Sequence, residues 1–186
     1  MGKSLALGLG MWLLLSLSQT PAHATLMLAL DLSQLADRAD QVVLATVEKT
    51  EARWTDSHDS IFTEVTLRVS KVYKGAVQPG GVVVVRREGG SVNGIAMRVF
   101  GSPQFVAGEE AVVFAQRRGG SDWVVGMSQG KLLVVADATG RRLVSPPDLS
   151  GVSFLKPETV PPQRTRALDE FEQDLAGVLS SSRPRK

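Results

Sequence analysis

Short runs rich in β-branched residues, separated by turns, are the feature that most restricts the fold of this chain. The runs cover residues 42–47, 61–73, 82–86, 111–115, 123–125, 131–135 and 142–144. Glycine-bearing turns separate many of them, at 78–81, 88–90, 119–122 and 137–140. Short strands at this spacing are typical of an all-β architecture that closes on itself. The sequence therefore predicts a mainly β domain over residues 25–145, built as a small closed or partly open β-barrel.

The run 61–73 indicates which side chains face the core. Val65, Leu67 and Val69 alternate with polar residues, as in a strand with one buried face. The polar side chains expected on the outer face are Glu64, Thr66 and Arg68. The alternation fails after Ser70, where the apolar and polar positions exchange. We expect a bulge there, of the kind that bends strands in small barrels.

A short helix is predicted at the start of the domain. Apolar residues recur at helical spacing over residues 32–39, and Asp31 or Ser33 can cap the first turn.

The end of the chain differs from the barrel. Residues 146–164 contain five prolines, which predicts an irregular connection. Residues 165–180 then place Leu168, Phe171 and Leu175 on one face, which predicts a C-terminal amphipathic helix packed outside the barrel. Residues 181–186 form a polar, basic tail.

The first 24 residues have the order of a secretory signal peptide. Lys3 precedes an uncharged apolar run over residues 5–17, shorter than the roughly 20 residues of a membrane-spanning helix. Ala22 and Ala24 then supply the small residues of a cleavage site. Cleavage after Ala24 predicts an exported mature protein, periplasmic or secreted, that begins at Thr25. We expect no membrane span in this mature chain.

Composition removes several classes of function. The chain has no cysteine, so it has no disulfide, thiol nucleophile, lipid-modified cysteine or zinc–thiolate site. Its 21 lysines and arginines nearly balance 19 aspartates and glutamates. Because near-neutral charge gives no general attraction to nucleic acid, we do not expect nucleic acid as a partner.

Histidine is also scarce, which limits the catalytic chemistry of the chain. His23 leaves with the signal peptide, so His58 is the one histidine of the mature sequence, and it lies in a polar turn. No nucleophile motif accompanies it, and a cation site in the same turn would have too few ligands. Glu109 and Glu110 are neighbours on a strand and should point to opposite faces. We therefore expect no catalytic, metal or cofactor site.

Two tryptophans and three arginine pairs are the candidate partner-binding residues. Trp54 and Trp123 lie at strand ends, where exposed aromatic side chains can anchor a partner. The arginine pairs occupy residues 86–87, 117–118 and 141–142, each where a strand is predicted to end. The candidate residues from these pairs are Arg86, Arg117 and Arg141. If these ends lie together, they form a basic rim for an acidic partner. The alternative interpretation is solvated strand ends that discourage edge pairing.

The glycine-bearing stretch 89–105 is predicted to be a structured loop and is a further candidate contact. It lacks the lysine and the helix of a phosphate loop, so its glycines are better explained by turns.

Four segments of the chain occur in a familiar order. They cover residues 35–40, 42–47, 65–75 and 105–114. In this order they resemble the barrel core of the tissue-inhibitor-of-metalloproteinases and netrin-like group, an OB-fold family. They are also similar to cysteine-free exported bacterial proteins. The resemblance implies an OB-like barrel. It implies no inhibitory residue, because the inhibitors of that group chelate zinc through an N-terminal cysteine, whereas this mature chain would begin with Thr25.

These observations predict an exported, non-catalytic binding module for a protein or an envelope component. Three alternatives stay open. A metalloprotease inhibitor-like protein would need an accessible N-terminus at Thr25, and a structural part of an envelope assembly would need a surface for its neighbours. A hydrolase with an unrecognised site is the third, and the scarcity of histidine and cysteine argues against it. The oligomeric state stays open as well.

Overall fold

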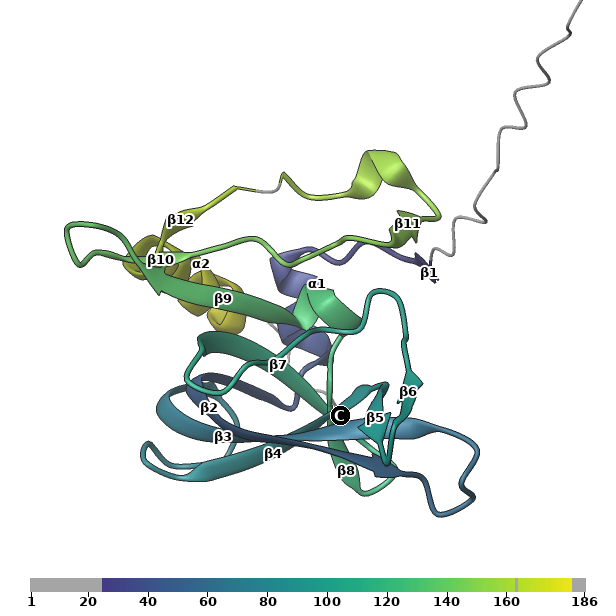
Figure 1. Ribbon diagram of the computed structural model, residues 1–186. Helices are drawn as coiled ribbons and strands as arrows, with labels where there is room; N and C mark the ends of the chain where they lie inside the picture. Colours follow the sequence, from purple (N-terminus) through teal and green to yellow (C-terminus); the bar gives the residue numbers. More distant parts are fainter. Residues whose placement is uncertain (1–24, 163, 182–186) are drawn as a thin grey trace, which may run out of the picture.

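The computed structural model describes residues 25–162 and 164–181, which form a body dominated by β-strands (Figure 1). In these residues the strands are β1 (Thr25–Met27), β2 (Gln41–Trp54), β3 (Ile61–Lys74), β4 (Val82–Glu88), β5 (Gly90–Val92), β6 (Ile95–Met97), β7 (Glu110–Arg118), β8 (Ser121–Val124), β9 (Lys131–Ala136), β10 (Arg142–Val144), β11 (Val152–Phe154) and β12 (Arg166–Ala167). The α-helices are α1 (Leu32–Arg38) and α2 (Leu168–Ser181), and short 3-10 helices are η1 (Met127–Gly130) and η2 (Pro157–Thr159). The predicted fold class, mainly β with a short N-terminal helix and a C-terminal helix, is confirmed.

Five strands of the main sheet close into a ring. The sheet has the order β12-β10-β9-β7-β2-β3-β4-β8, and β8 also pairs with β7. The circuit therefore runs through β7, β2, β3, β4 and β8, while β9, β10 and β12 extend the sheet beyond β7. Neighbours in the ring are antiparallel except β4 and β8. Closure removes much of the unpaired strand edge that a flat sheet would expose.

Two apolar cores lie on opposite faces of β2 and β7, because successive side chains of a strand alternate in direction. The ring core consists of Val43, Ala45, Val47, Val65, Leu67, Val69, Val83, Val85, Phe105, Ala111, Val113, Ala115 and Val124. The helix-side core takes the intervening strand residues, among them Val42, Leu44, Val112 and Phe114, and packs them against both α-helices.

The alternation predicted for β3 is confirmed. Val65, Leu67 and Val69 are buried, while the polar residues between them are half-buried or exposed. The predicted bulge is also present: the pairing of β2 with β3 skips Ser70, whose hydroxyl donates to the Leu44 carbonyl oxygen at 3.0 Å. Such a bulge increases the local bend and twist of a strand, which helps the β2–β3 pair to follow the ring.

α1 begins at a capping box. Asp31 Oδ1 accepts a hydrogen bond from the Gln34 backbone N–H at 2.8 Å, and Gln34 Oε1 accepts one from the Asp31 N–H at 3.0 Å. Of the two predicted caps, Asp31 is therefore the N-cap, and the Ser33 hydroxyl donates to its carboxylate.

α2 covers the helix-side core with its three predicted apolar side chains buried. Glu172 joins the helix to β3, because its carboxylate accepts from Lys71 Nζ and from the Tyr73 hydroxyl, each at 2.6 Å. Burial, and then this hydrogen bond, raise the pKa of Tyr73 far above its usual range, so the hydroxyl remains a donor. The helix starts at Leu168 rather than at residue 165, since the preceding residues join the sheet as β12.

The short strands β1 and β11 have no counterpart among the predicted elements. β1 pairs in parallel with β11, which lies inside the connection 146–164 that the prolines marked as irregular. Each has three residues, too few for alternation to show in a sequence. Within the predicted loop 89–105, β6 forms a hairpin with β5.

The predicted signal peptide, residues 1–24, lies outside the described residues, as does the predicted tail apart from Ser181. None of the helices in the described part of the chain is long and apolar enough to cross a membrane.

Candidate functional site

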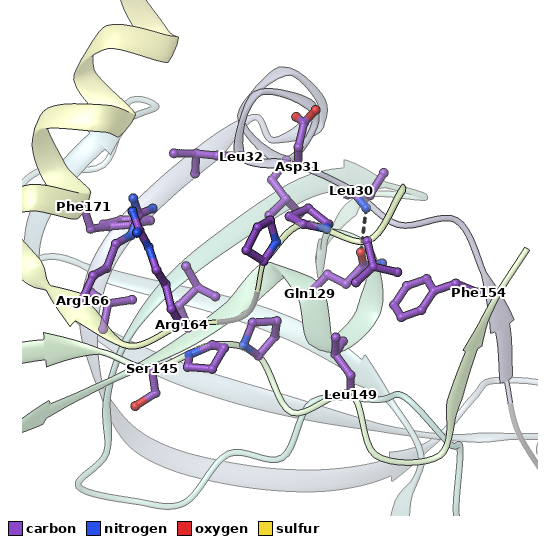
Figure 2. Close-up of a pocket in the computed structure, with 18 residues that line it drawn as sticks. Leu30, Asp31, Leu32, Gln129, Ser145, Leu149, Phe154, Arg164, Arg166 and Phe171 are labelled. Carbon is purple, nitrogen blue, oxygen red and sulfur yellow. Dashed lines mark hydrogen bonds between the residues drawn. The ribbon is translucent and has the colours of Figure 1, made fainter. Parts of the chain in front are cut away.

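A groove opens over the helix-side core, beneath the proline-rich connection (Figure 2). It encloses about 420 Å³. Leu35 of α1, Leu132 of β9 and Phe171 of α2 belong to its lining, and the connection adds Leu149, Phe154 and four prolines. Because most of these side chains are apolar, we refer to this cavity as the apolar groove.

The groove exists because the connection leaves the sheet and later returns to it. Pro146 and Pro147 follow β10 closely, and proline has no N–H group to continue a strand ladder. The middle of the connection is held where β11 pairs with β1, and its end where β12 pairs with β10. The connection thus bridges the helix-side core between two fixed points.

Gln129 is the buried polar side chain of the groove, and its hydrogen bonds are satisfied internally. Its Oε1 accepts from the Leu30 N–H at 2.8 Å (Figure 2). Its Nε2 donates to the Leu28 carbonyl oxygen at 3.1 Å. In residues 25–162 and 164–181, the buried side-chain polar atoms without a hydrogen bond are Arg87 Nε and Ser128 Oγ, and neither lines this groove. The groove therefore offers a partner mainly apolar surface.

Arg164 and Arg166 lie side by side at one end of the groove (Figure 2). Arg166 pairs with Asp174, and its guanidinium carbon lies 4.9 Å from the centre of the Phe171 ring. The Arg164 side chain is 72% exposed and pairs loosely with Glu170, at 3.7 Å. Arg164 is therefore the charge that a ligand entering this end would meet first.

A second cavity, of about 470 Å³, lies where the β5–β6 hairpin and residues 97–104 meet residues 148–150. Arg87 of β4 lines it, and we refer to it as the Arg87 pocket. Of the pair Arg86 and Arg87, the sequence predicted Arg86 as the partner-binding residue. The sequence pattern could also have indicated Arg87. Val83 and Val85 alternate toward the core, and Arg87 is the next residue on that face of the strand.

Two of the predicted anchors, Trp123 and Arg86, meet on the outer face of the ring. They are directly paired residues of β8 and β4. Phe62 lies between them, with its ring centre 6.3 Å from that of Trp123 and 4.3 Å from the Arg86 guanidinium carbon. Arg118 completes the cluster, 4.4 Å over the Trp123 ring.

This cluster has little free charge. Arg86 pairs with Glu64 at 2.7 Å, and Arg118 pairs with Glu88 at 3.3 Å. The arrangement favours the interpretation of solvated, charge-paired strand ends over a strongly basic rim.

The other three candidates lie elsewhere. Trp54 stacks on His58 in the β2–β3 turn, with ring centres 6.2 Å apart. Arg117 pairs with Asp122 at 3.3 Å and points away from Trp123, because its neighbour Arg118 occupies that face. Arg141 lies in the β9–β10 turn, on the extension of the sheet rather than on the ring. The structure therefore does not join the three arginine pairs in a single rim.

The acidic neighbours Glu109 and Glu110 are engaged separately. Glu109 pairs with Lys131 at 2.8 Å, and Glu110 pairs with Arg142 at 2.6 Å. His58 is exposed, and its Nδ1 lies 3.2 Å from the Asp56 carbonyl oxygen. In the described ranges, no three His, Asp or Glu side chains gather as a metal site would require.

Comparison with known proteins adds no relative. A scan against protein-family models found no match, and a search of curated proteins also found none. The resemblance to the netrin-like group therefore stays a prediction.

Proposed function

We propose that this chain is an exported, non-catalytic binding module that holds an apolar group of a protein or envelope component in the apolar groove. The observation that carries the proposal is the groove itself. Its volume of about 420 Å³ falls within the roughly 300–1,000 Å³ of ligand sites, and its lining is mainly apolar with charge at one end. These are the properties of a site that recognises a ligand by shape and apolar contact.

The side-chain chemistry around the groove supports binding rather than turnover. Its carboxylate, Asp31, is committed to capping α1. The hydrogen bonds from Ser33 and Gln34 lower its pKa, which keeps it an acceptor rather than a general acid. The guanidinium groups of Arg164 and Arg166, which also line the groove, carry hydrogen-bond donors and no acceptor.

The inhibitor alternative receives less support. Its mechanism needs a free N-terminal amine and carbonyl, whereas Thr25 is built into β1. The Thr25 backbone nitrogen donates to the Gly151 carbonyl oxygen at 3.0 Å, and its hydroxyl donates to the Phe100 carbonyl oxygen at 2.5 Å. One observation favours the assembly role. Leu26, Leu28 and Leu155 are all more than half exposed and could contact a neighbouring protein.

A tryptophan placed in the groove should block it. The change is Leu149→Trp, because Leu149 lines the groove from the connection and is only half-buried. The neutral apolar dye N-phenyl-1-naphthylamine should bind the parent with a rise in fluorescence, and the variant should bind it about tenfold more weakly or not at all. Titration of purified protein with the dye measures both affinities.

The matched control is Leu155→Trp, the same exchange at an exposed leucine of the same segment that does not line the groove. It should bind the dye like the parent. Equal dye affinity for all three proteins, or no binding to the parent, would remove the groove as the site.

Export has its own test. The mature protein isolated from the exported fraction should begin at Thr25, because Ala22 and Ala24 supply the small residues of the cleavage site. N-terminal sequencing measures this start, and Ala24→Glu should leave the precursor uncut. Recovery of the intact precursor from the cytoplasm of parent cells would contradict the prediction.

A further inference from the structure

The apolar groove is polarised, because its positive charge lies at one end. Figure 2 shows the side chains of Arg164 and Arg166 at that end, and those of Leu149 and Phe154 at the other. The carboxylate among the described residues that line the groove is Asp31, which is already the N-cap of α1. A ligand lying along the groove therefore meets apolar side chains over most of its length and a positive charge at one end.

Of the two arginines, Arg164 is the one that is open to a ligand. The Arg166 side chain is only 20% exposed and is paired with Asp174. The Arg164 side chain is 72% exposed, and its Nη2 lies 3.7 Å from Glu170 Oε1, which is too long for a hydrogen bond. Both members of this loose pair face solvent, and such pairs contribute little to stability. A ligand can therefore take the place of Glu170 at small cost.

The apolar part of the groove offers few hydrogen-bonding groups to a ligand. Four of its lining residues are prolines, which have no N–H to donate. The side-chain amide of Gln129 is already bonded to the backbone of Leu28 and Leu30. Among the described residues, the buried side-chain atoms without a hydrogen bond lie outside the groove. A peptide backbone laid here would be short of partners, whereas a hydrocarbon chain needs none.

We propose that the apolar groove binds a fatty acid, with the acyl chain along the groove and the carboxylate beside Arg164. The inference rests on the function proposed above and names the ligand class of the same groove. A guanidinium edge offers two parallel N–H groups to the two oxygens of a carboxylate. Each methylene that leaves water against the apolar lining adds to the affinity. One aliphatic chain with one negative head group thus matches both ends of the groove.

The test measures displacement of N-phenyl-1-naphthylamine from the purified mature protein. The competitors are decanoate and decanol, which have the same chain length and differ in the charge of the head group. Each is used below the concentration at which it aggregates. Both should displace the dye, because both chains fill the groove. Raising the salt concentration to about 0.5 M should weaken decanoate about threefold relative to decanol, since salt screens an exposed ion pair.

Arg164→Gln is the decisive variant, because it removes the charge at an exposed position and keeps a polar side chain. Its affinity for decanoate should fall about fivefold, while its affinity for decanol should not change. Comparing both ligands in both proteins separates the head-group contact from any general effect on the groove. The matched control is Arg141→Gln, at an exposed arginine that does not line the groove, and it should keep both affinities of the parent.

Glu170→Gln tests the same contact in the opposite direction. The change removes the carboxylate that competes for Arg164, and Glu170 does not line the groove itself. Decanoate should therefore bind about threefold more tightly than to the parent, and decanol should bind equally.

The outcomes separate this inference from the function on which it rests. If Leu149→Trp blocks the dye but decanoate does not displace it, or Arg164→Gln affects decanoate and decanol alike, the groove binds apolar groups and the fatty-acid assignment is wrong. Tighter binding of a trileucine peptide than of decanoate would also overturn the assignment, in favour of a peptide ligand. If the dye does not bind the parent, the proposed function fails and this inference fails with it.

Discussion

Phe171→Asp is expected to leave little folded protein at room temperature. Phe171 is fully buried in the helix-side core, where it packs with Leu35 of α1 and Leu175 of α2. Removing a buried phenylalanine side chain alone costs about 3–5 kcal/mol. An unpaired carboxylate in its place adds the cost of desolvating a charge. Domains of this size are stable by only about 5–15 kcal/mol, so the sum approaches the whole free energy of unfolding.

Circular dichroism during a urea titration would measure the effect. Gln173→Asp is the control, because it adds the same charge to an exposed position of the same helix. It should change the free energy of unfolding by no more than about 0.5 kcal/mol. If Phe171→Asp unfolded at the same urea concentration as the parent, α2 would not be part of the core.

Leu67→Ala should be the most damaging conservative truncation in the ring core. Leu67 is fully buried there, and Val47 and Val83 face it from the strands on either side. A buried leucine replaced by alanine loses about 2–5 kcal/mol, the upper part of that range applying where neighbours cannot collapse into the cavity. A closed ring restricts such collapse, because each wall is paired to the next. Urea denaturation measures the loss.

Arg68→Ala, one residue further along β3, provides the comparison. Arg68 points outward and pairs with Glu48 at 2.8 Å, with its side chain 49% exposed. An exposed ion pair contributes at most about 1 kcal/mol. Equal losses in the two variants would show that the register of β3 is wrong.

Much of the ring could be predicted from the sequence, since it rests on long alternating strands. β3 illustrates why: its inward residues, its outward residues and its bulge at Ser70 all leave a mark on the local pattern. α2 was equally visible through its apolar face. Its first turn was placed too early, because pairing with β10, a long-range contact, draws the preceding residues into the sheet.

The two cavities could not be predicted in the same way. The apolar groove depends on the pairing of β1 with β11, which joins residues about 127 apart in the chain and leaves no periodic signal. The prolines showed only that residues 146–164 are irregular, not that they cover a core.

The candidate binding residues show the same limit. The candidates were chosen at predicted strand ends, but which strands lie together is a matter of topology. Trp123 and Arg86 meet because β8 pairs with β4, whereas Arg141 lies on the extension beyond β7. Arg87 was within reach of a local argument, because the phase of β4 places it inward.

The sharing of β2 and β7 between two cores makes the molecule cooperative. Val43 and Val113 support the ring, while their neighbours Val42 and Val112 support the helices. Neither side can release these strands without exposing the apolar residues of the other. The two halves therefore form one thermodynamic unit, and under the proposed function the free energy of binding a ligand in the groove would also stabilise the ring.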